Sequence, residues 1–144
     1  MKQPPPNPAL RSLEVLMGEW EMESPQFPEG RGRTTFRWLE DGAYLVWRSD
    51  VPEPAPSSTW IIGSDESTGT CTALYYDTRA VARVYHMSFG DGVWKVWRED
   101  VPGFWQRFRG TLSDDGRTIR GAWESSPDGS EWKHDFDLIY TKVS

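Results

Sequence analysis

The chain has little of the residue types that most often bind metals, act as nucleophiles or form cross-links. Its 144 residues include one cysteine, Cys71, and two histidines, His86 and His134. A single cysteine excludes a disulfide framework within the chain and a cysteine-based zinc site. The spacings His-x-x-x-His and His-x-His do not occur, nor do Gly-x-Ser-x-Gly or phosphate-loop patterns. The sequence therefore favours neither a metal nor a nucleophile as the catalytic group.

Long apolar runs and an excess of basic charge are also absent. No stretch approaches the roughly 20 apolar residues of a membrane helix, and the first residues, Met-Lys-Gln-Pro-Pro-Pro-Asn-Pro, lack the apolar core of a signal peptide. The formal net charge is −6, whereas nucleic-acid binding requires a basic patch. We therefore expect a cytoplasmic protein that binds neither membranes nor nucleic acid, with no metal at its site.

Aromatic residues are abundant, and glycine and proline mark many turns. Nine Trp, five Tyr and six Phe supply more aromatic surface than the core of one small domain usually needs. We interpret residues 1–7 as a Pro-rich leader and residues 8–144 as one domain. Asn7-Pro8 is typical of a helix start, and Leu10, Leu13 and Leu16 follow at helical spacing before Gly18.

After Gly18 the sequence reads as strands and turns. About ten antiparallel strands in one domain predict an all-β, up-and-down barrel, because closure leaves no exposed edge. A turn at Asp41-Gly42 would pair Phe36 with Trp47 and Trp38 with Leu45. The strands are expected near residues 19–24, 31–40, 43–50, 58–64, 70–77, 80–89, 92–99, 103–112, 117–125 and 130–142.

Alternation along the strands predicts which side chains face the barrel interior. Residues 131–142 alternate so that Trp132, His134, Phe136, Leu138 and Tyr140 share the apolar face. The same reasoning places one side of each earlier strand inside and His86 outside. The resulting candidate ligand-binding residues are Trp47, Tyr85, Gln106, Phe108, Trp123, His134 and Phe136.

These residues suggest a pocket for a small hydrophobic or aromatic molecule, in which Gln106 and His134 orient the ligand. Three alternatives remain. His134 with help from Tyr85 would act as an acid or base on the ligand, His134 would hold a haem, or the aromatic rings would fill the barrel completely. The oligomeric state is open, and Trp60 and Trp94 are candidate exposed contacts between subunits.

Two segments resemble the lipocalin-like, or calycin, barrels. Leu13–Trp20, which reads Leu-Glu-Val-Leu-Met-Gly-Glu-Trp, resembles their helix followed by Gly-x-Trp. Residues 110–142 are similar to the end of a bacterial family of unknown function within that group. The resemblance implies a ten-stranded closed barrel and no established activity.

The resemblance extends to fatty-acid-binding proteins and nitrobindins, with departures. Leu138 stands where the Arg-x-Tyr carboxylate anchor of the first group would place an arginine, two residues before Tyr140, and residues 24–30 are too short for their helical pair. Nitrobindins hold haem through a late histidine, to which His134 would correspond. Met22 and Ser24 replace the glycines of their opening motif, which places haem in doubt.

Overall fold

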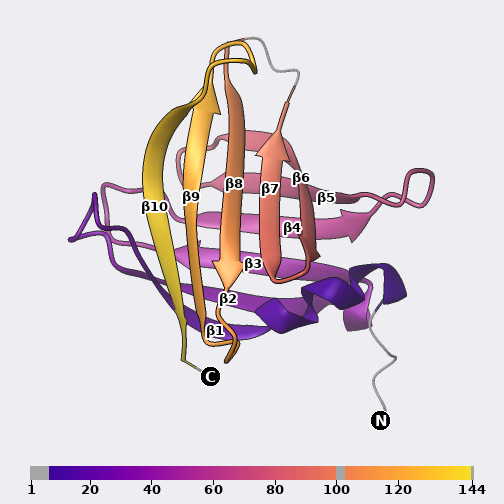
Figure 1. Ribbon diagram of the computed structural model, residues 1–144. Coiled ribbons are helices and arrows are strands. Elements are labelled where there is room, and N and C mark those ends of the chain that lie inside the picture. Colours follow the sequence, from indigo (N-terminus) through magenta and orange to yellow (C-terminus); the bar gives the residue numbers. More distant parts are fainter. Residues whose placement is uncertain (1–6, 100–102, 144) are drawn as a thin grey trace.

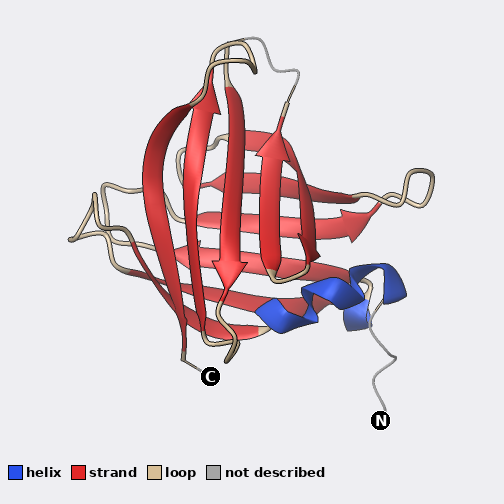
Figure 2. Ribbon diagram, in the orientation of Figure 1, coloured by secondary structure: helices blue, strands red, loops and turns tan. Residues whose placement is uncertain are grey.

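The computed structural model of the protein describes residues 7–99 and 103–143. It consists of ten strands, a helix before them and one short turn of helix between the second and third strands (Figures 1 and 2). The helices are η1 (Pro8–Leu16) and η2 (Glu40–Gly42). The strands are β1 (Gly18–Glu23), β2 (Gly32–Leu39), β3 (Tyr44–Asp50), β4 (Ser58–Ser64), β5 (Cys71–Asp77), β6 (Ala82–Gly90), β7 (Val93–Arg98), β8 (Trp105–Leu112), β9 (Thr118–Ser126) and β10 (Lys133–Lys142).

The strands form a closed antiparallel barrel, which confirms the predicted fold class. Each strand pairs with its neighbours in sequence, and β1 pairs with β10 to close the sheet. In Figure 1, β7 to β10 run almost at right angles to β2 to β5, as expected when a strongly twisted sheet curls onto itself. The lipocalin-like family itself stays a resemblance, because closure and strand order establish the barrel alone.

The predicted register between the second and third strands is confirmed. Phe36 lies opposite Trp47 and Trp38 lies opposite Leu45. The turn between them uses left-handed backbone at Asp41, with φ of 55°, and at Gly42, with φ of 95°. These signs match the right-handed twist of the flanking strands. The alternation that follows directs Phe36, Leu45 and Trp47 into the barrel, where all three are buried.

The predicted N-terminal helix is present, and it is a 3₁₀ helix. The Asn7 side chain accepts a hydrogen bond from the Ala9 amide at 3.0 Å, as expected of a cap. Leu10, Leu13 and Leu16 are three residues apart, which equals the repeat of a 3₁₀ helix, so all three lie on one face and are fully buried. This face packs against β4 and β6 and closes one end of the barrel (Figure 1).

The half of the barrel next to η1 is filled by apolar side chains. Trp20 and Trp94 are fully buried there, and the Trp20 indole donates a hydrogen bond to the Leu16 carbonyl at 2.8 Å. Trp94 contacts Phe36, Phe108 and Tyr140 at ring-centroid distances of 5.8, 5.0 and 5.5 Å. The expectation that Trp94 is an exposed contact between subunits is therefore wrong, because the alternation along β7 directs it inward.

A pair of glycines lets the Phe108 ring lie flat against the sheet. Gly110 on β8 lies opposite Gly121 on β9. A Cβ added at Gly121 would lie 2.5 Å from Phe108 Cζ and 2.7 Å from the Arg109 carbonyl oxygen. The ring therefore occupies the space that two ordinary side chains would fill. Such covering of strand glycines by an aromatic ring favours one register over its neighbours.

Other sequence predictions meet the structure only in part. The proposed leader at residues 1–7 lies outside the described residues except for Asn7, which caps η1 and donates its backbone N–H to the Gly42 carbonyl.

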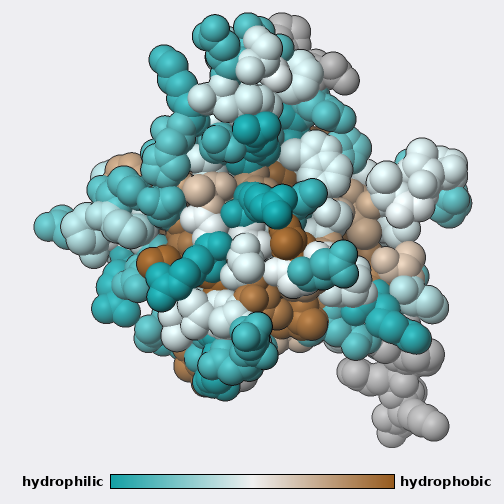
Figure 3. Space-filling model, in the orientation of Figure 1, coloured by the Kyte–Doolittle hydropathy of each residue, from teal (hydrophilic) through white to brown (hydrophobic). Residues whose placement is uncertain are grey.

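Within the described chain, no helix combines the length and apolar character needed to cross a membrane. The face of the barrel in Figure 3 is mostly hydrophilic, with smaller apolar patches between the polar side chains.

Candidate ligand cavity

The half of the barrel away from η1 contains a cavity of about 530 Å³. It is lined by β1, by β3 to β6 and by β8 to β10, together with the loops 24–30, 51–57 and 78–81, which gather at the end of the barrel opposite the helix (Figure 1). Its volume falls within the range of typical small-molecule pockets, about 300–1,000 Å³. The alternative of a completely filled barrel therefore does not describe this half. Residues that line the cavity include Met22, Ser24, Phe27, Trp47, Ser49, Ser58, Trp60, Tyr75, Arg79, Arg83, Tyr85, Phe104, Gln106, Trp123, Asp135, Phe136, Leu138 and Tyr140.

One wall of the cavity is a set of stacked aromatic rings. Trp47 stacks on Trp60 with centroids 4.1 Å apart and planes 11° apart, and Phe36 stacks on the other side of Trp47 at 5.6 Å. Trp60 continues to Tyr85 at 4.9 Å and to Tyr75 at 4.7 Å. Trp60 is 4% exposed, so the expectation of a surface contact is wrong here too. The wall is a preformed apolar surface suited to a flat ligand.

The aromatic wall also carries two hydroxyl groups, those of Tyr85 and Tyr75, and each forms a hydrogen bond. The Tyr85 hydroxyl on β6 donates a hydrogen bond to Gln106 Oε1 on β8, on the other side of β7. The Tyr75 hydroxyl donates to Asp77 Oδ2 at 2.6 Å. Because its oxygen accepts from Tyr85, Gln106 keeps its amide NH₂ for another acceptor. A ligand in the cavity thus meets mainly carbon surface with a few fixed polar atoms.

Asp77 is the centre of a tight network at the β5–β6 turn. Its side chain is fully covered, and its oxygens accept from the Arg79 guanidinium at 2.6 Å and from the Arg79 amide at 2.8 Å as well as from Tyr75. The hydrogen bonds from Arg79 hold the pKa of Asp77 well below its usual range. Burial and the neighbouring carboxylate raise the pKa of Tyr75. Asp77 therefore stays ionised and Tyr75 neutral at ordinary pH.

The prediction that His134 faces the cavity is wrong. β10 carries a bulge between His134, which pairs with Glu124, and Phe136, which pairs with Trp123. The extra residue reverses the alternation before it, so His134 is exposed on the outer surface, where its Nε2 lies 3.0 Å from Asp137 Oδ1. Asp135, expected on the wet face, lines the cavity instead.

The same bulge places Trp132 outside, contrary to expectation. Its ring lies under the Arg107 guanidinium, whose carbon is 3.9 Å from the ring centroid. Beyond the bulge the Gln26 amide donates to Asp137 Oδ2 at 2.9 Å and accepts from the Asp137 amide, which fastens the β1–β2 loop to β10. These hydrogen bonds, together with His134, lower the pKa of Asp137. His134 thus belongs to a surface network.

Five of the seven predicted ligand-binding residues line the cavity: Trp47, Tyr85, Gln106, Trp123 and Phe136. Phe108 is buried beneath them, 5.4 Å from the Trp123 ring, and supports the cavity floor. His134 does not belong to the cavity. Sequence reasoning also missed Tyr75, Arg79 and the loop residues. The alternation of β5, with Ala73 and Tyr75 on one face, was the signal available for Tyr75.

The residues present do not fit a haem held by histidine. His134 lies on the outer surface, and the predicted outward orientation of His86 is confirmed, since it packs beside Trp97 with ring centroids 5.6 Å apart. Both histidines of the sequence are therefore outside the cavity. In the described part of the chain, no group of three His, Cys, Asp or Glu side chains is arranged to hold a metal ion.

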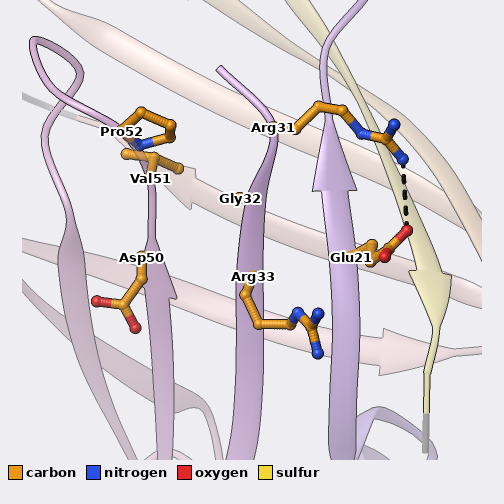
Figure 4. Close-up of a pocket in the computed structure, with 7 residues that line it drawn as sticks. All are labelled: Glu21, Arg31, Gly32, Arg33, Asp50, Val51 and Pro52. Carbon is orange, nitrogen blue, oxygen red and sulfur yellow. Dashed lines mark hydrogen bonds and ion pairs between the residues drawn. The ribbon is translucent and has the colours of Figure 1, made fainter. Parts of the chain in front are cut away.

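A second hollow, on the outside of the barrel, has the character of an ordinary surface groove. Figure 4 shows it over β1, β2 and β3, with Glu21 joined to Arg31 at 3.4 Å. Its charged groups are exposed, and Arg33 and Asp50 form ion pairs with Glu19 and Arg48. A Cβ at Gly32 would lie 2.4 Å from the Asp50 carbonyl oxygen, so the groove reflects close strand packing. We assign it no ligand.

Comparison with known proteins supports the fold alone. No family model matches the chain, and no curated protein matches it. The chain is similar in structure to the crystal structure of Rv2717c from M. tuberculosis, with a TM-score of 0.64 and 11% sequence identity. The similarity covers 97% of this chain and 100% of that chain. The barrel is thus shared with a solved structure, and it is compatible with ligand binding.

Proposed function

We propose that the barrel binds a small hydrophobic, ring-bearing molecule in the cavity opposite η1. The observation that carries this proposal is the cavity of about 530 Å³ walled by the stacked rings of Trp47, Trp60 and Tyr85. Burying apolar ligand surface contributes about 25 cal/mol per Å² before the costs of association. The rings already pack against one another, so little conformational entropy is lost when a ligand is bound.

The acid–base alternative receives no support from this geometry. It requires His134 beside the ligand, and His134 lies outside the barrel. Tyr85, its suggested assistant, donates to the amide oxygen of Gln106, which is not a base that would activate it. Ligand binding without chemistry is therefore the function that the cavity supports best, and we expect it to take place in the cytoplasm.

A thermal-shift screen against aromatic and fatty compounds tests the proposal. A ligand that binds only the folded state at a hundredfold excess over its Kd stabilises by roughly 2.7 kcal/mol. Trp47, Trp60 and Trp123 line the cavity, so each hit should also change the intrinsic fluorescence. Absence of any shift or fluorescence change across the panel would contradict the proposal.

A pair of variants separates binding in the cavity from binding elsewhere. Ser58 lines the cavity and is buried, so Ser58→Phe should fill the space beside Trp60 and weaken every hit. Leu74→Phe adds a ring to the outer face of β5, where Leu74 is exposed, and should leave the hits unchanged. Equal effects of the two variants would place the bound compounds outside the barrel.

A further inference from the structure

The Arg98 guanidinium lies next to the lining residues Tyr85 and Gln106, although Arg98 is not itself among the residues that line the cavity. Arg98 Nη1 is buried, and no hydrogen-bond partner for it exists within the described residues. Arg98 ends β7 and pairs with Gln106 on β8, and its guanidinium carbon is 6.0 Å from the Tyr85 ring centroid. A buried charged donor without an acceptor is costly, since hydrogen bonds to water are lost and not replaced. An acceptor in the adjoining cavity would remove that cost.

Gln106 presents further donors at the same place. β7 lies between β6 and β8, so the hydrogen bond from Tyr85 to Gln106 crosses the interior side of β7 near Arg98. This bond uses the Gln106 oxygen and orients its NH₂ group away from Tyr85. The guanidinium and the amide therefore lie side by side on the interior face of adjacent strands.

The charge around the cavity differs from that of the whole protein. Arg79 is neutralised by Asp77, but Arg83, half-buried and 5.1 Å from the Phe104 ring centroid, forms no ion pair within the described chain. The opposing charge in the cavity lining is Asp135, on β10. Arg83 in the lining and Arg98 next to it thus stand against one carboxylate of the lining, Asp135, although the chain carries a net charge of −6. The cavity is a locally cationic place in an acidic protein.

We propose that the ligand is an apolar, ring-bearing anion whose carboxylate or sulfonate binds at Arg98 and Gln106. The ring system packs on Trp60 and Tyr85, and the acidic oxygens accept hydrogen bonds from the guanidinium and the amide. Arg83, which lines the cavity from β6, adds attraction for the same charge. This inference rests on the proposed function, because it names the chemical class of the ligand for the same cavity. Planar, bidentate donors of this kind are well suited to carboxylate-like groups.

Two dyes that differ by one anionic group test the inference. 8-Anilinonaphthalene-1-sulfonate carries a sulfonate, and N-phenyl-1-naphthylamine is its neutral counterpart. Fluorescence titration should show the sulfonate dye binding about tenfold tighter or more, as expected of a hydrogen bond to a charged group. Arg98→Gln should remove that preference and leave the affinity for the neutral dye unchanged within about twofold. The matched control is Arg109→Gln, which removes the same charge from the exposed outer face of β8.

The outcomes separate the two proposals. Retained binding of the neutral dye shows that Arg98→Gln is folded with its cavity intact. Arg83→Gln, in the cavity lining, should weaken binding of the sulfonate dye by about threefold, and it keeps the test decisive if Arg98→Gln does not fold. Equal affinity for both dyes, unchanged by the two variants, would overturn the anionic ligand and leave the apolar cavity in place. Failure of both dyes to bind would overturn both proposals.

Discussion

Replacing Gly121 with alanine should destabilise the barrel through one added methyl group. The new Cβ would lie 2.5 Å from Phe108 Cζ and 2.7 Å from the Arg109 carbonyl oxygen, well inside van der Waals contact. The ring can shift only toward Trp94 and Trp123, whose centroids are 5.0 and 5.4 Å away. The carbonyl oxygen belongs to the β8 ladder and cannot move without disturbing the register.

The expected cost follows from these overlaps. Overpacking a filled core usually costs about 1–3 kcal/mol, and a clash with both a ring and fixed backbone belongs at the upper end, about 2–3 kcal/mol. For a chain of this size, that loss should lower Tm by about 6–10 °C. Phe108→Leu should relieve the overlap with the ring but not the overlap with the carbonyl. The double variant should therefore be more stable than the sum of the single effects by about 1 kcal/mol.

Urea denaturation followed by tryptophan fluorescence measures these free energies. Gly90→Ala is the matched control, because nothing lies within 4 Å of a Cβ added there. Its free energy of unfolding should stay within about 0.5 kcal/mol of that of the wild type. If Gly121→Ala unfolds at the same urea concentration as Gly90→Ala, the packing of Phe108 against the two glycines is not as described here.

Three further predictions concern the surface histidine, the β5–β6 turn and the closed end of the barrel. His134→Ala should leave the affinity for both naphthyl dyes unchanged, because the imidazole lies outside; a loss of tenfold or more in the titration would contradict its placement. The lowered pKa of Asp77 means that its stabilisation is present above the unfolded value near 4 and is lost as the pH falls below it. Asp77→Asn should therefore be less stable than the wild type at pH 7 by about 1–3 kcal/mol, and this difference should shrink as the pH falls from 4 toward 2 in urea melts; a difference that is the same at pH 7 and at pH 2 would refute the assignment. Leu13→Ala should cost about 2–5 kcal/mol, whereas Val15→Ala on the exposed side of η1 should cost little in the same melts.

Much of the barrel could be predicted because its strands obey a simple alternation. The pairing of Phe36 with Trp47 followed from the turn at Asp41-Gly42 and a period of two. The face of β6 that carries Tyr85 and Met87 followed in the same way, and both residues are buried. Leu10, Leu13 and Leu16 predicted the helix, although spacing of three residues fits a 3₁₀ helix better than an α-helix.

The bulge in β10 could not be predicted from the alternation. The segment from Trp132 to Tyr140 alternates without a break, and a bulge appears only when β10 pairs with β9. The bulged region carries no glycine to mark it, so His134 and Asp135 exchange sides relative to expectation. His134, the most important residue of the predicted site, therefore lies on the outer surface and not in the cavity.

The loop and charged parts of the cavity could not be derived either. Phe27 and Arg79 lie on loops, and their positions at the cavity depend on the loop paths. Arg83 lies on β6 on the same face as Tyr85, so alternation does place it inside. Arg98 ends β7, and the position of its guanidinium beside Tyr85 and Gln106 is apparent only once β6 and β8 flank β7. Alternation identifies the inward faces, but it does not say which half of the interior is filled.

The pairing of β1 with β10 has a consequence for how the chain is made. β1 pairs with residues 139–142 of β10, so the ring of strands cannot close until β10 has been synthesised. Until then one edge of β1 has no strand partner. The helix η1 does not cover this edge, because it packs against β4 and β6. Contacts between such distant segments slow folding. We expect nascent chains that stop before β10 to depend on chaperones, whereas the complete barrel presents no edge for other strands to join.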